Sequence, residues 1–391
     1  MKHGWEIKEL GECFIHIKNG ANIKQERGAG GIPITRIETL SGGTFNRDRL
    51  GYANLDNTDR YQSYIMESGD LLLSHINSKS YIGRTVVYIK EGNETIIHGM
   101  NLLRIKVNPQ IITPFFTYYY SQTDKFKTQI ANRRKDAVNQ SSISISELKT
   151  ILIPVPPLPV QEQIVSELDL LSGIIEKKRE QLKELDALAQ SIFYDMFGDP
   201  EQSSYNIIPL FKLSNNKLSY GSGASAIPFN GEIRYIRITD IKEDGKLNTE
   251  AVSPSIMEDK YILNEGDILF ARSGATVGKT YLYKESDGKA IYAGYLIRFI
   301  PNKEQVLPTY IYYYTKTDYY KAFISKSAQA VAQPNINAQQ YGSLMVPIPP
   351  LPLQHQFASK IEAIERQKEL IKQSISETET LFNERMQHYF N

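Results

Sequence analysis

The sequence predicts an α+β protein built from two similar halves in tandem, with a long helix after the mixed α+β region of each half. Three observations predict this class: a proline-rich phrase that occurs twice, further motifs that match in the same order, and a heptad pattern after each phrase. The phrases are IPVPPLPVQEQ (153–163) and VPIPPLPLQHQ (346–356), and Pro154 lies 193 positions before Pro347 in a chain of 391 residues. This spacing indicates a tandem duplication.

Other motifs repeat at nearly the same spacing. The matched pairs are GDLLL (69–73) with GDILF (266–270), TYYY (117–120) with IYYY (311–314), and AVNQ (137–140) with AVAQ (330–333). Because the matches keep their order over most of the chain, chance does not explain them. Two domains are also what the length of the chain favours.

The composition is that of an ordinary globular protein, with 41% hydrophobic and 23% charged residues. No uncharged apolar run is long enough for a membrane span, and the N-terminal residues lack a signal-peptide core, so we expect a cytoplasmic protein. Cys13 is the single cysteine and the six histidines are scattered, so we expect neither a disulfide nor a metal site.

The net charge of +1 conceals an uneven distribution. Basic residues exceed acidic ones by five in 1–152 and by three in 205–346, whereas acidic residues exceed basic ones by six in 153–204 and by one in 347–391. A polyanion would therefore be attracted to the two large segments and repelled by the segments that follow them. The modest excess supports nucleic-acid binding without establishing it.

The large segments have the pattern of mixed α+β domains. Short apolar runs such as DLLLSHI and DILFARS, separated by Gly, Asn and Asp, predict strands. The stretches around TYYY and IYYY carry apolar and aromatic residues on a helical period, which favours helices. The tyrosine triplets could stack on bases, but their helical spacing favours a place in the core.

A heptad seam follows each proline phrase over about 38 residues. Neither helix can bury such a seam alone, so we expect the two to pack as an antiparallel coiled coil with the basic domains at opposite ends. The first seam is Ile164, Leu168, Leu171, Ile175, Lys178, Leu182, Leu185, Ala189, Ile192 and Met196, and the second is Phe357, Ile361, Ile364, Lys368, Ile371, Ile375, Thr378, Phe382, Arg385 and Tyr389.

The proline phrases predict a stiff, extended entry into each long helix. Proline fixes φ and disfavours helix for the residue before it, so the phrase sets the angle at which the helix leaves its domain. The alternative is a polyproline ligand for a partner domain. Duplication in register with a helix start favours the structural hinge.

No catalytic constellation is present in the sequence. GATVGKT (274–280) resembles a phosphate-binding loop, but only three residues separate Gly274 from Gly278 where that loop requires four. Neither a Gly-x-Ser-x-Gly elbow nor a His-Glu-x-x-His helix occurs. We therefore expect a binding protein with no catalytic residues.

The combined motifs resemble the specificity subunit of type I restriction–modification systems. The resemblance covers essentially the whole chain and depends on Gly69-Asp70 and Gly266-Asp267, Gln140 and Gln333, Pro156-Pro157 and Pro349-Pro350, and Phe197-Gly198-Asp199-Pro200. It implies target recognition domains at 1–152 and 201–346. It also implies proline hinges with spacer helices at 153–200 and 347–391.

The resemblance implies a function and a set of partners. The partners would be double-stranded DNA, two methyltransferase subunits and, where present, restriction subunits. S-adenosylmethionine, ATP and Mg would bind to those subunits. No cofactor would bind to this chain. The recognition domains differ between the halves, so we expect an asymmetric bipartite target. The alternative is a protein-interaction scaffold that binds no DNA.

Candidate DNA contacts lie in two pairs of loops, where Arg, Lys, Asn and Gln could reach base edges or phosphates. Gln140 and Gln333 could instead cap a turn, and Arg133 with Arg134 could simply be solvated. Arg36 and Arg237 are expected to be structural. The candidates are Ser74, His75, Asn77, Lys79, Arg84, Arg133, Arg134, Gln140, Ser141, Arg272, Ser273, Thr276, Lys279, Gln333 and Asn335.

Overall fold

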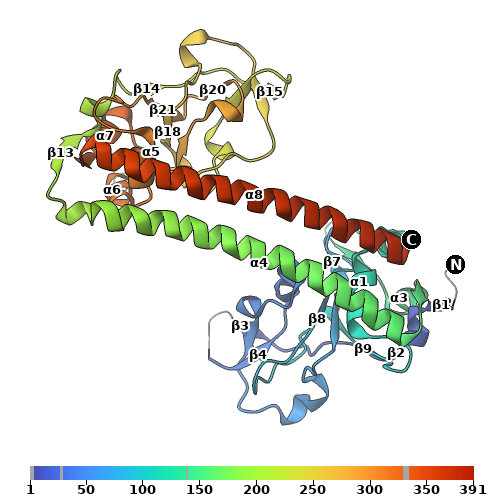
Figure 1. Cartoon of the computed structure of the whole chain (residues 1–391). Helices are drawn as coiled ribbons and strands as arrows, with labels where there is room; N and C mark the ends of the chain where they lie inside the picture. The colour runs from blue at the N-terminus through green and yellow to red at the C-terminus, as the bar shows by residue number, and fades with distance from the viewer. Residues whose placement is uncertain (1–3, 27–29, 138–139, 329–333) are drawn as a thin grey trace. The chain divides into compact units, whose positions relative to one another are not determined.

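The computed structural model describes residues 4–26, 30–137, 140–328 and 334–391 (Figure 1). The chain forms two compact units, one made of Met1–Lys178 with Ser374–Asn391 and the other of Arg179–Gln373. Each unit therefore contains one α+β region together with a segment of each long helix. The predicted α+β class with two related halves is confirmed.

The first unit is organised around a four-stranded antiparallel sheet in the order β2-β9-β6-β8. One face of this sheet packs on three short helices and on the long helices, and Leu72, Val86 and Leu102 join a separate cluster with Leu40, Met66, Tyr88 and Ile96. The strands of this sheet are β2 (Phe14–Asn19), β9 (Leu102–Val107), β6 (Leu71–Ser74) and β8 (Thr85–Val87). Three smaller sheets pair β1 (Glu6–Glu9) with β12 (Leu152–Val155), β3 (Gln25–Glu26) and β4 (Ile32–Ile34) with β5 (Gly51–Ala53), and β7 (Ile76–Asn77) and β10 (Lys135–Asp136) with β11 (Ser141–Ser142). The short helices are α1 (Pro114–Gln122), α2 (Asp124–Arg133) and α3 (Ile145–Lys149).

The second unit repeats this plan with the order β14-β21-β18-β19. Its elements match those of the first unit one by one in the central sheet and in the short helices. They are β14 (Ser219–Tyr220), β21 (Leu296–Phe299), β18 (Ile268–Ala271) and β19 (Thr280–Leu282), the pairs β13 (Asn206–Pro209) with β22 (Met345–Ile348), β15 (Ala226–Pro228) with β17 (Val252–Pro254) and β16 (Arg234–Ile236) with β20 (Ala290–Tyr292), and the helices α5 (Pro308–Tyr314), α6 (Asp318–Ala328) and α7 (Ala338–Gly342).

The repeated Gly-Asp motif builds the turn into the central strand. Gly69 and Gly266 adopt φ values of 90° and 91°, a left-handed conformation that glycine adopts without steric cost. The carboxylate of Asp70 accepts a hydrogen bond from the backbone N–H of Glu67 and lies 3.6 Å from Arg104, and Asp267 is matched in the same way by Asn264 and Arg298. A buried ion pair therefore sits at the start of the central strand in both units.

The tyrosine triplets belong to the core, as predicted. Tyr119, Tyr120, Tyr313 and Tyr314 are buried on the first helices of the two domains. The hydroxyl of Tyr120 donates to the carbonyl of Leu152, and that of Tyr314 donates to Met345 at 2.6 Å. These bonds tie each helix to the strand that carries the proline phrase. The rings of these four tyrosines are thus not available to stack on bases.

Each proline phrase leads through a short strand directly into a long helix, and a buried glutamine fixes this entry. The Gln161 amide donates to the carbonyls of Ile111 and Pro156 and accepts from the Thr113 N–H, each at 2.9 Å. Gln354 makes the matching three bonds in the second unit. Since a buried amide needs its partners, the glutamine holds the helix to its domain at a set angle.

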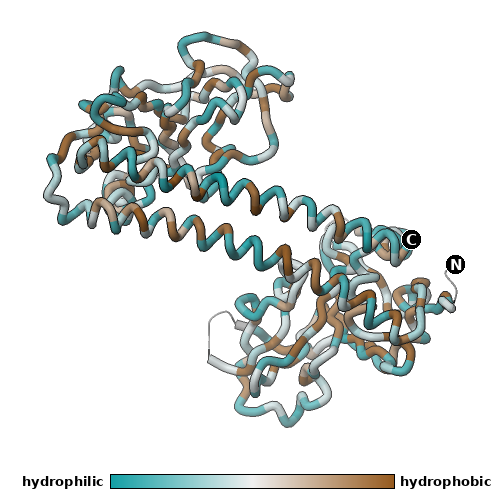
Figure 2. The backbone as a smooth tube through the Cα atoms, viewed as in Figure 1, coloured by the Kyte–Doolittle hydropathy of each residue, from teal (hydrophilic) through white to brown (hydrophobic). Residues whose placement is uncertain are grey.

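The long helices are α4 (Leu158–Phe197) and α8 (Leu351–Phe390), with 40 residues each. At 1.5 Å per residue each is about 60 Å long. In the first unit the start of α4 packs on the end of α8, where Ile164 and Leu168 join one cluster with Met386 and Phe390. In the second unit the end of α4 packs on the start of α8. The predicted antiparallel pairing is confirmed, and Figure 2 shows apolar residues recurring along both helices.

Burial follows the predicted seam along both helices, except at the exposed Arg385, and a second row of buried side chains joins the seam at the C-terminal end of each helix. Every seam residue from Ile164 to Leu185 and from Phe357 to Phe382 is buried or partly buried. Beyond them Phe193 and Phe197 are buried next to the partly buried Ile192 and Met196, and Met386 and Phe390 are buried next to the exposed Arg385 and the partly buried Tyr389. The spacing changes from alternating four and three to successive fours, because a helix with 3.6 residues per turn drifts from a strict heptad. At these ends the helices also pack on the domain cores.

The lysine in each seam finds a polar partner on the other helix, and Lys368 also pairs with Glu365 on its own helix. Lys178 Nζ donates to the hydroxyls of Ser374, at 2.5 Å, and Thr378. Lys368 is almost fully buried and lies 2.5 Å from Asp186 and 2.6 Å from Glu365. A buried polar pair of this kind penalises a shifted register, since the shift would leave the ammonium unpaired.

Candidate nucleic-acid interface

The structure brings the two predicted loops together in each unit. In the first unit β7 pairs with β11, and the Ile143 N–H donates to the carbonyl of His75 at 2.9 Å. In the second unit the Ile336 N–H donates to the carbonyl of Arg272 at 2.8 Å, and Ser273 bridges to Asn335. The loop after the Gly-Asp strand and the loop after the Ala-Val motif therefore form one surface in each half.

Three candidates in the first unit are buried. Ser74 is 1% exposed, His75 7% and Ser141 1%. The Ser141 hydroxyl donates to Asp136, and burial lowers the pKa of His75 to about 4, so the ring is neutral at pH 7. A buried side chain cannot meet a base edge, and we therefore assign these three to the support of the loops. The sequence alone did not reveal their burial.

The exposed candidates of the first unit surround one carboxylate. Lys79 Nζ lies 3.0 Å from Asp136, and Arg134 Nε lies 3.0 Å from the same carboxylate. These hydrogen bonds, with that of Ser141 the largest, lower the pKa of Asp136 to about 2. Arg84 is exposed and lies over the ring of Tyr81, 3.7 Å from its centroid. Asn77 is partly buried and Gln140 is exposed on the same surface.

Arg133 has a structural role. Its guanidinium donates to the hydroxyl and the carbonyl of Thr150 and to the carbonyl of Gln129. The two bonds to Thr150 tie α2 to the segment that precedes β12, and the bond to Gln129 stays within the helix. Arg237 likewise binds Asp240 at 2.8 Å and Arg36 lies 3.4 Å from Glu38, so both arginines are structural as predicted.

In the second unit the exposed polar groups gather around Arg272. Its Nε donates to Asn335 Oδ1 at 3.3 Å, and its guanidinium lies 4.7 Å from the centroid of the Tyr220 ring. Ser273 and Thr276 are partly exposed on the same loop, and Lys279 pairs with Glu243 at 2.7 Å. Gln333 lies outside the described residues. Tyr220 was missed because a lone tyrosine far from both loops in the sequence gives no signal.

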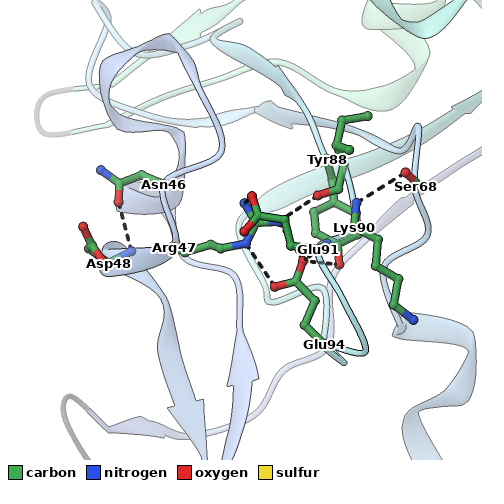
Figure 3. A network of polar contacts seen from close by, with 9 residues as sticks. Asn46, Arg47, Asp48, Ser68, Tyr88, Lys90, Glu91 and Glu94 are labelled. Atoms are coloured by element: carbon green, nitrogen blue, oxygen red, sulfur yellow. Dashed lines mark hydrogen bonds and ion pairs between the residues drawn. The ribbon is translucent and has the colours of Figure 1, made fainter. Parts of the chain in front are cut away.

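Some basic side chains outside the loops form ion pairs within their own domain, and Arg47 is the clearest example (Figure 3). Its guanidinium makes a bidentate contact with Glu94, at 3.0 and 2.7 Å, and also lies 2.7 Å from Glu91. Glu94 accepts a further bond from the hydroxyl of Tyr88 at 2.9 Å. The network fastens the 3₁₀ turn at 47–49 to the loop that follows β8, so Arg47 is not counted among the DNA contacts.

This network predicts an acid-dependent loss of stability. The hydrogen bonds from Arg47 are the largest cause of a Glu94 pKa lowered from 4.5 to about 2. A lowered carboxyl pKa contributes stability that is complete above pH 4.5 and is lost as the pH falls toward 2. We expect Arg47→Gln to remove about 1 kcal/mol of the stability at pH 6, allowing for solvent screening, and almost none at pH 2. Urea unfolding over that pH range measures the difference.

The control for this prediction is Arg49→Gln on the same 3₁₀ turn, where the side chain is exposed. It should leave the pH dependence unchanged. Equal losses for Arg47→Gln at both pH values would show that the arginine acts by packing alone.

Neither a candidate metal site nor a membrane-spanning helix occurs in the part of the chain that the structure describes. Within those residues no group of three or more His, Cys, Asp or Glu side chains is placed to hold a metal ion. Of the described helices, none combines the length and apolar character needed to cross a bilayer. The two-loop surfaces, with their donors and acceptors, are suited to binding.

Comparison with known proteins identifies the family. The profile described as the type I restriction modification DNA specificity domain matches residues 2–186 and again 205–380. The chain belongs to this family, with two copies of its domain in tandem.

Relatives match along nearly the full length. A Methanocaldococcus jannaschii chain assigned to the specificity subunit of the type I restriction enzyme MjaX is 31% identical over 92% of this chain and 87% of its own. The MjaVIII specificity subunit of the same organism is 23% identical over 92% of this chain and 86% of its own.

Solved structures share the fold. The type I system S subunit from M. genitalium superposes with a TM-score of 0.58 at 15% identity over 99% of this chain and 96% of that one. A chain from a type I system, solved to explain its assembly and conformational transition, gives 0.57 at 14% identity over 99% and 97%. At such identities the likeness concerns the fold alone.

Proposed function

We propose that this chain is a specificity subunit that reads a bipartite, asymmetric target in double-stranded DNA. The observation that carries the proposal is the pair of matching two-loop surfaces, one on each α+β domain, built on the same sheet order but with different side chains. The family match supports DNA recognition and does not favour the alternative of a scaffold that binds no DNA.

We further propose that the chain is non-catalytic and positions adenine-N6 methyltransferase subunits, and restriction subunits where present, on its target. S-adenosylmethionine, ATP and Mg would then be bound by those partners. Support comes from the family and from the sequence, which carries no complete phosphate-binding loop and no Asp/Asn-Pro-Pro-aromatic tetrapeptide for methyl transfer.

The long helices suggest how the gap between the two half-sites is set. Each is continuous over 40 residues and is fixed to its own domain by a buried glutamine. Successive turns of DNA are about 34 Å apart, so a spacer about 60 Å long suits two readers in nearby grooves. We propose that the length of the helix pair sets the number of base pairs between the two half-sites.

The test is to co-express the chain with its methyltransferase and to map N6-methyladenine on a plasmid. The expected result is a split target whose modification requires the chain. Inserting one heptad into each helix, at the point where Lys178 meets Ser374, should lengthen the gap by about three base pairs, since seven residues add about 10 Å. The two half-sites should stay the same.

A matched control replaces residues 12–150 by those of a relative, which should alter one half-site and leave the gap unchanged. A target that is not split into two half-sites, or a gap whose length is unchanged by the insertion, would contradict the proposal that the helix pair sets the gap. Modification of the same sites without the chain would contradict the function itself.

A further inference from the structure

Four positions meet at one end of the central sheet in the second unit. Tyr220 is the last residue of β14, Arg272 directly follows β18, and Tyr295 directly precedes β21. The backbone N–H of Arg272 donates to the carbonyl of Tyr295 at 3.1 Å, and Asn335 comes from the loop that bridges to Ser273. These residues, which we call the sheet-end cluster, are far apart in the sequence and share one surface.

The cluster is exposed and holds its arginine in a fixed place. Tyr295 is 63% exposed and Tyr220 41%. The Tyr220 ring lies under the Arg272 guanidinium, and its hydroxyl is itself anchored, because it accepts a bond from the Ala338 N–H at 3.1 Å. The bond to Asn335 uses only the Nε–H of Arg272. The terminal fork of the guanidinium therefore has donors left for a ligand.

We propose that Arg272, held by Tyr220 and Asn335, reads a guanine in the major groove and so determines one base of the half-site of the second domain. An arginine fork matches O6 and N7 of guanine, and this is the commonest base-specific contact of proteins with DNA. Fixing the fork before binding reduces the conformational entropy lost in the complex. Tyr220 is a positioning residue in this arrangement. The inference rests on the proposed function.

The first unit has the same arrangement of strand ends as the sheet-end cluster, but different side chains occupy it. Asn19 pairs with Leu103 as Tyr220 pairs with Ile297, which makes the ends of β2 and β14 equivalent. The position of Arg272 is taken by His75, which is buried. Asn101, at the position of Tyr295, has a φ of 74°.

The partly exposed Arg272 is thus matched by a buried histidine in the first domain. Because the backbone frame is shared and the side chains are not, the two domains present different donors at equivalent places. This difference is a physical reason for an asymmetric target, and it assigns the guanine to the half-site of the second domain.

The experiment selects duplexes from a randomised library with the full chain and its methyltransferase, and compares Arg272→Ala with the unchanged protein. We expect the guanine preference at one position of one half-site to fall about tenfold or more, with the other half-site and the salt dependence unchanged. Tyr220→Ala should weaken the same preference, and Tyr220→Phe should retain it. Lys279→Ala is the control on the same loop, since its ammonium is paired with Glu243 and its loss should leave the base preference unchanged.

The outcomes separate this inference from the function on which it rests. If Arg272→Ala selects the same bases as the unchanged protein, or loses affinity equally for all duplexes, the arginine does not read a base and the inference fails. If the unchanged protein selects no sequence at all, the proposed function fails instead. Thermal unfolding of each variant shows whether a lost preference reflects a lost fold.

Discussion

Phe357→Ala is expected to lower the free energy of unfolding by about 4 kcal/mol, through the loss of buried apolar contacts and the cavity left behind. Phe357 is fully buried at the start of α8. Its ring centroid lies 5.7 Å from that of Phe193, 5.2 Å from that of Phe197 and 5.4 Å from that of Tyr313. Both long helices and the first helix of the second domain meet at this ring, and none of them can fill the cavity alone.

Calorimetry measures this effect, and a fall in the unfolding temperature of roughly 10 °C is expected for a unit of this size. Leu370→Ala is the matched control, because Leu370 lies on the same helix and is 68% exposed. It should change stability by less than about 0.5 kcal/mol. Similar shifts for the two variants would mean that the ring cluster does not hold the helices to the domain.

Asp267→Ala is expected to cost about 3 to 5 kcal/mol, because it leaves the guanidinium of Arg298 buried without its counter-charge. The two residues are 2% and 6% exposed. Asp267 also accepts a hydrogen bond from the backbone N–H of Asn264 at 2.7 Å, so the substitution removes a cap from the turn into β18. The equivalent change at Asp70, which faces Arg104, should have a similar effect in the first unit.

A double substitution tests this explanation. Asp267→Leu combined with Arg298→Met replaces the pair by apolar side chains and should restore most of the stability, since a buried ion pair contributes little beyond an apolar pair of similar volume. Asp259→Ala, at an exposed carboxylate, is the control and should have almost no effect. A double variant less stable than Asp267→Ala would indicate that Arg298 stabilises the sheet in some other way. Urea unfolding of the full chain provides all of these values.

Only part of the candidate site could be predicted. The sequence identified the two loops that the structure brings together in each unit, because short turns between strands and polar residues at their tips are local features. It did not separate the exposed Lys79 and Arg84 from the buried Ser74, His75 and Ser141. Burial there depends on the bond from Ile143 to His75, which joins segments that are distant in the sequence. Tyr220 and Tyr295 escaped notice for the same reason.

The sequence by itself determined the duplication, the α+β class of each half, the two long helices and the central part of their seam. These follow from periodicity and turn chemistry, which act over a few residues. Only the tertiary structure decided where the seam leaves the heptad, which loops share a surface, and which arginines are engaged by their own domain. Those outcomes depend on contacts between segments that are remote in the sequence, and no local sequence pattern indicates the energies of such contacts.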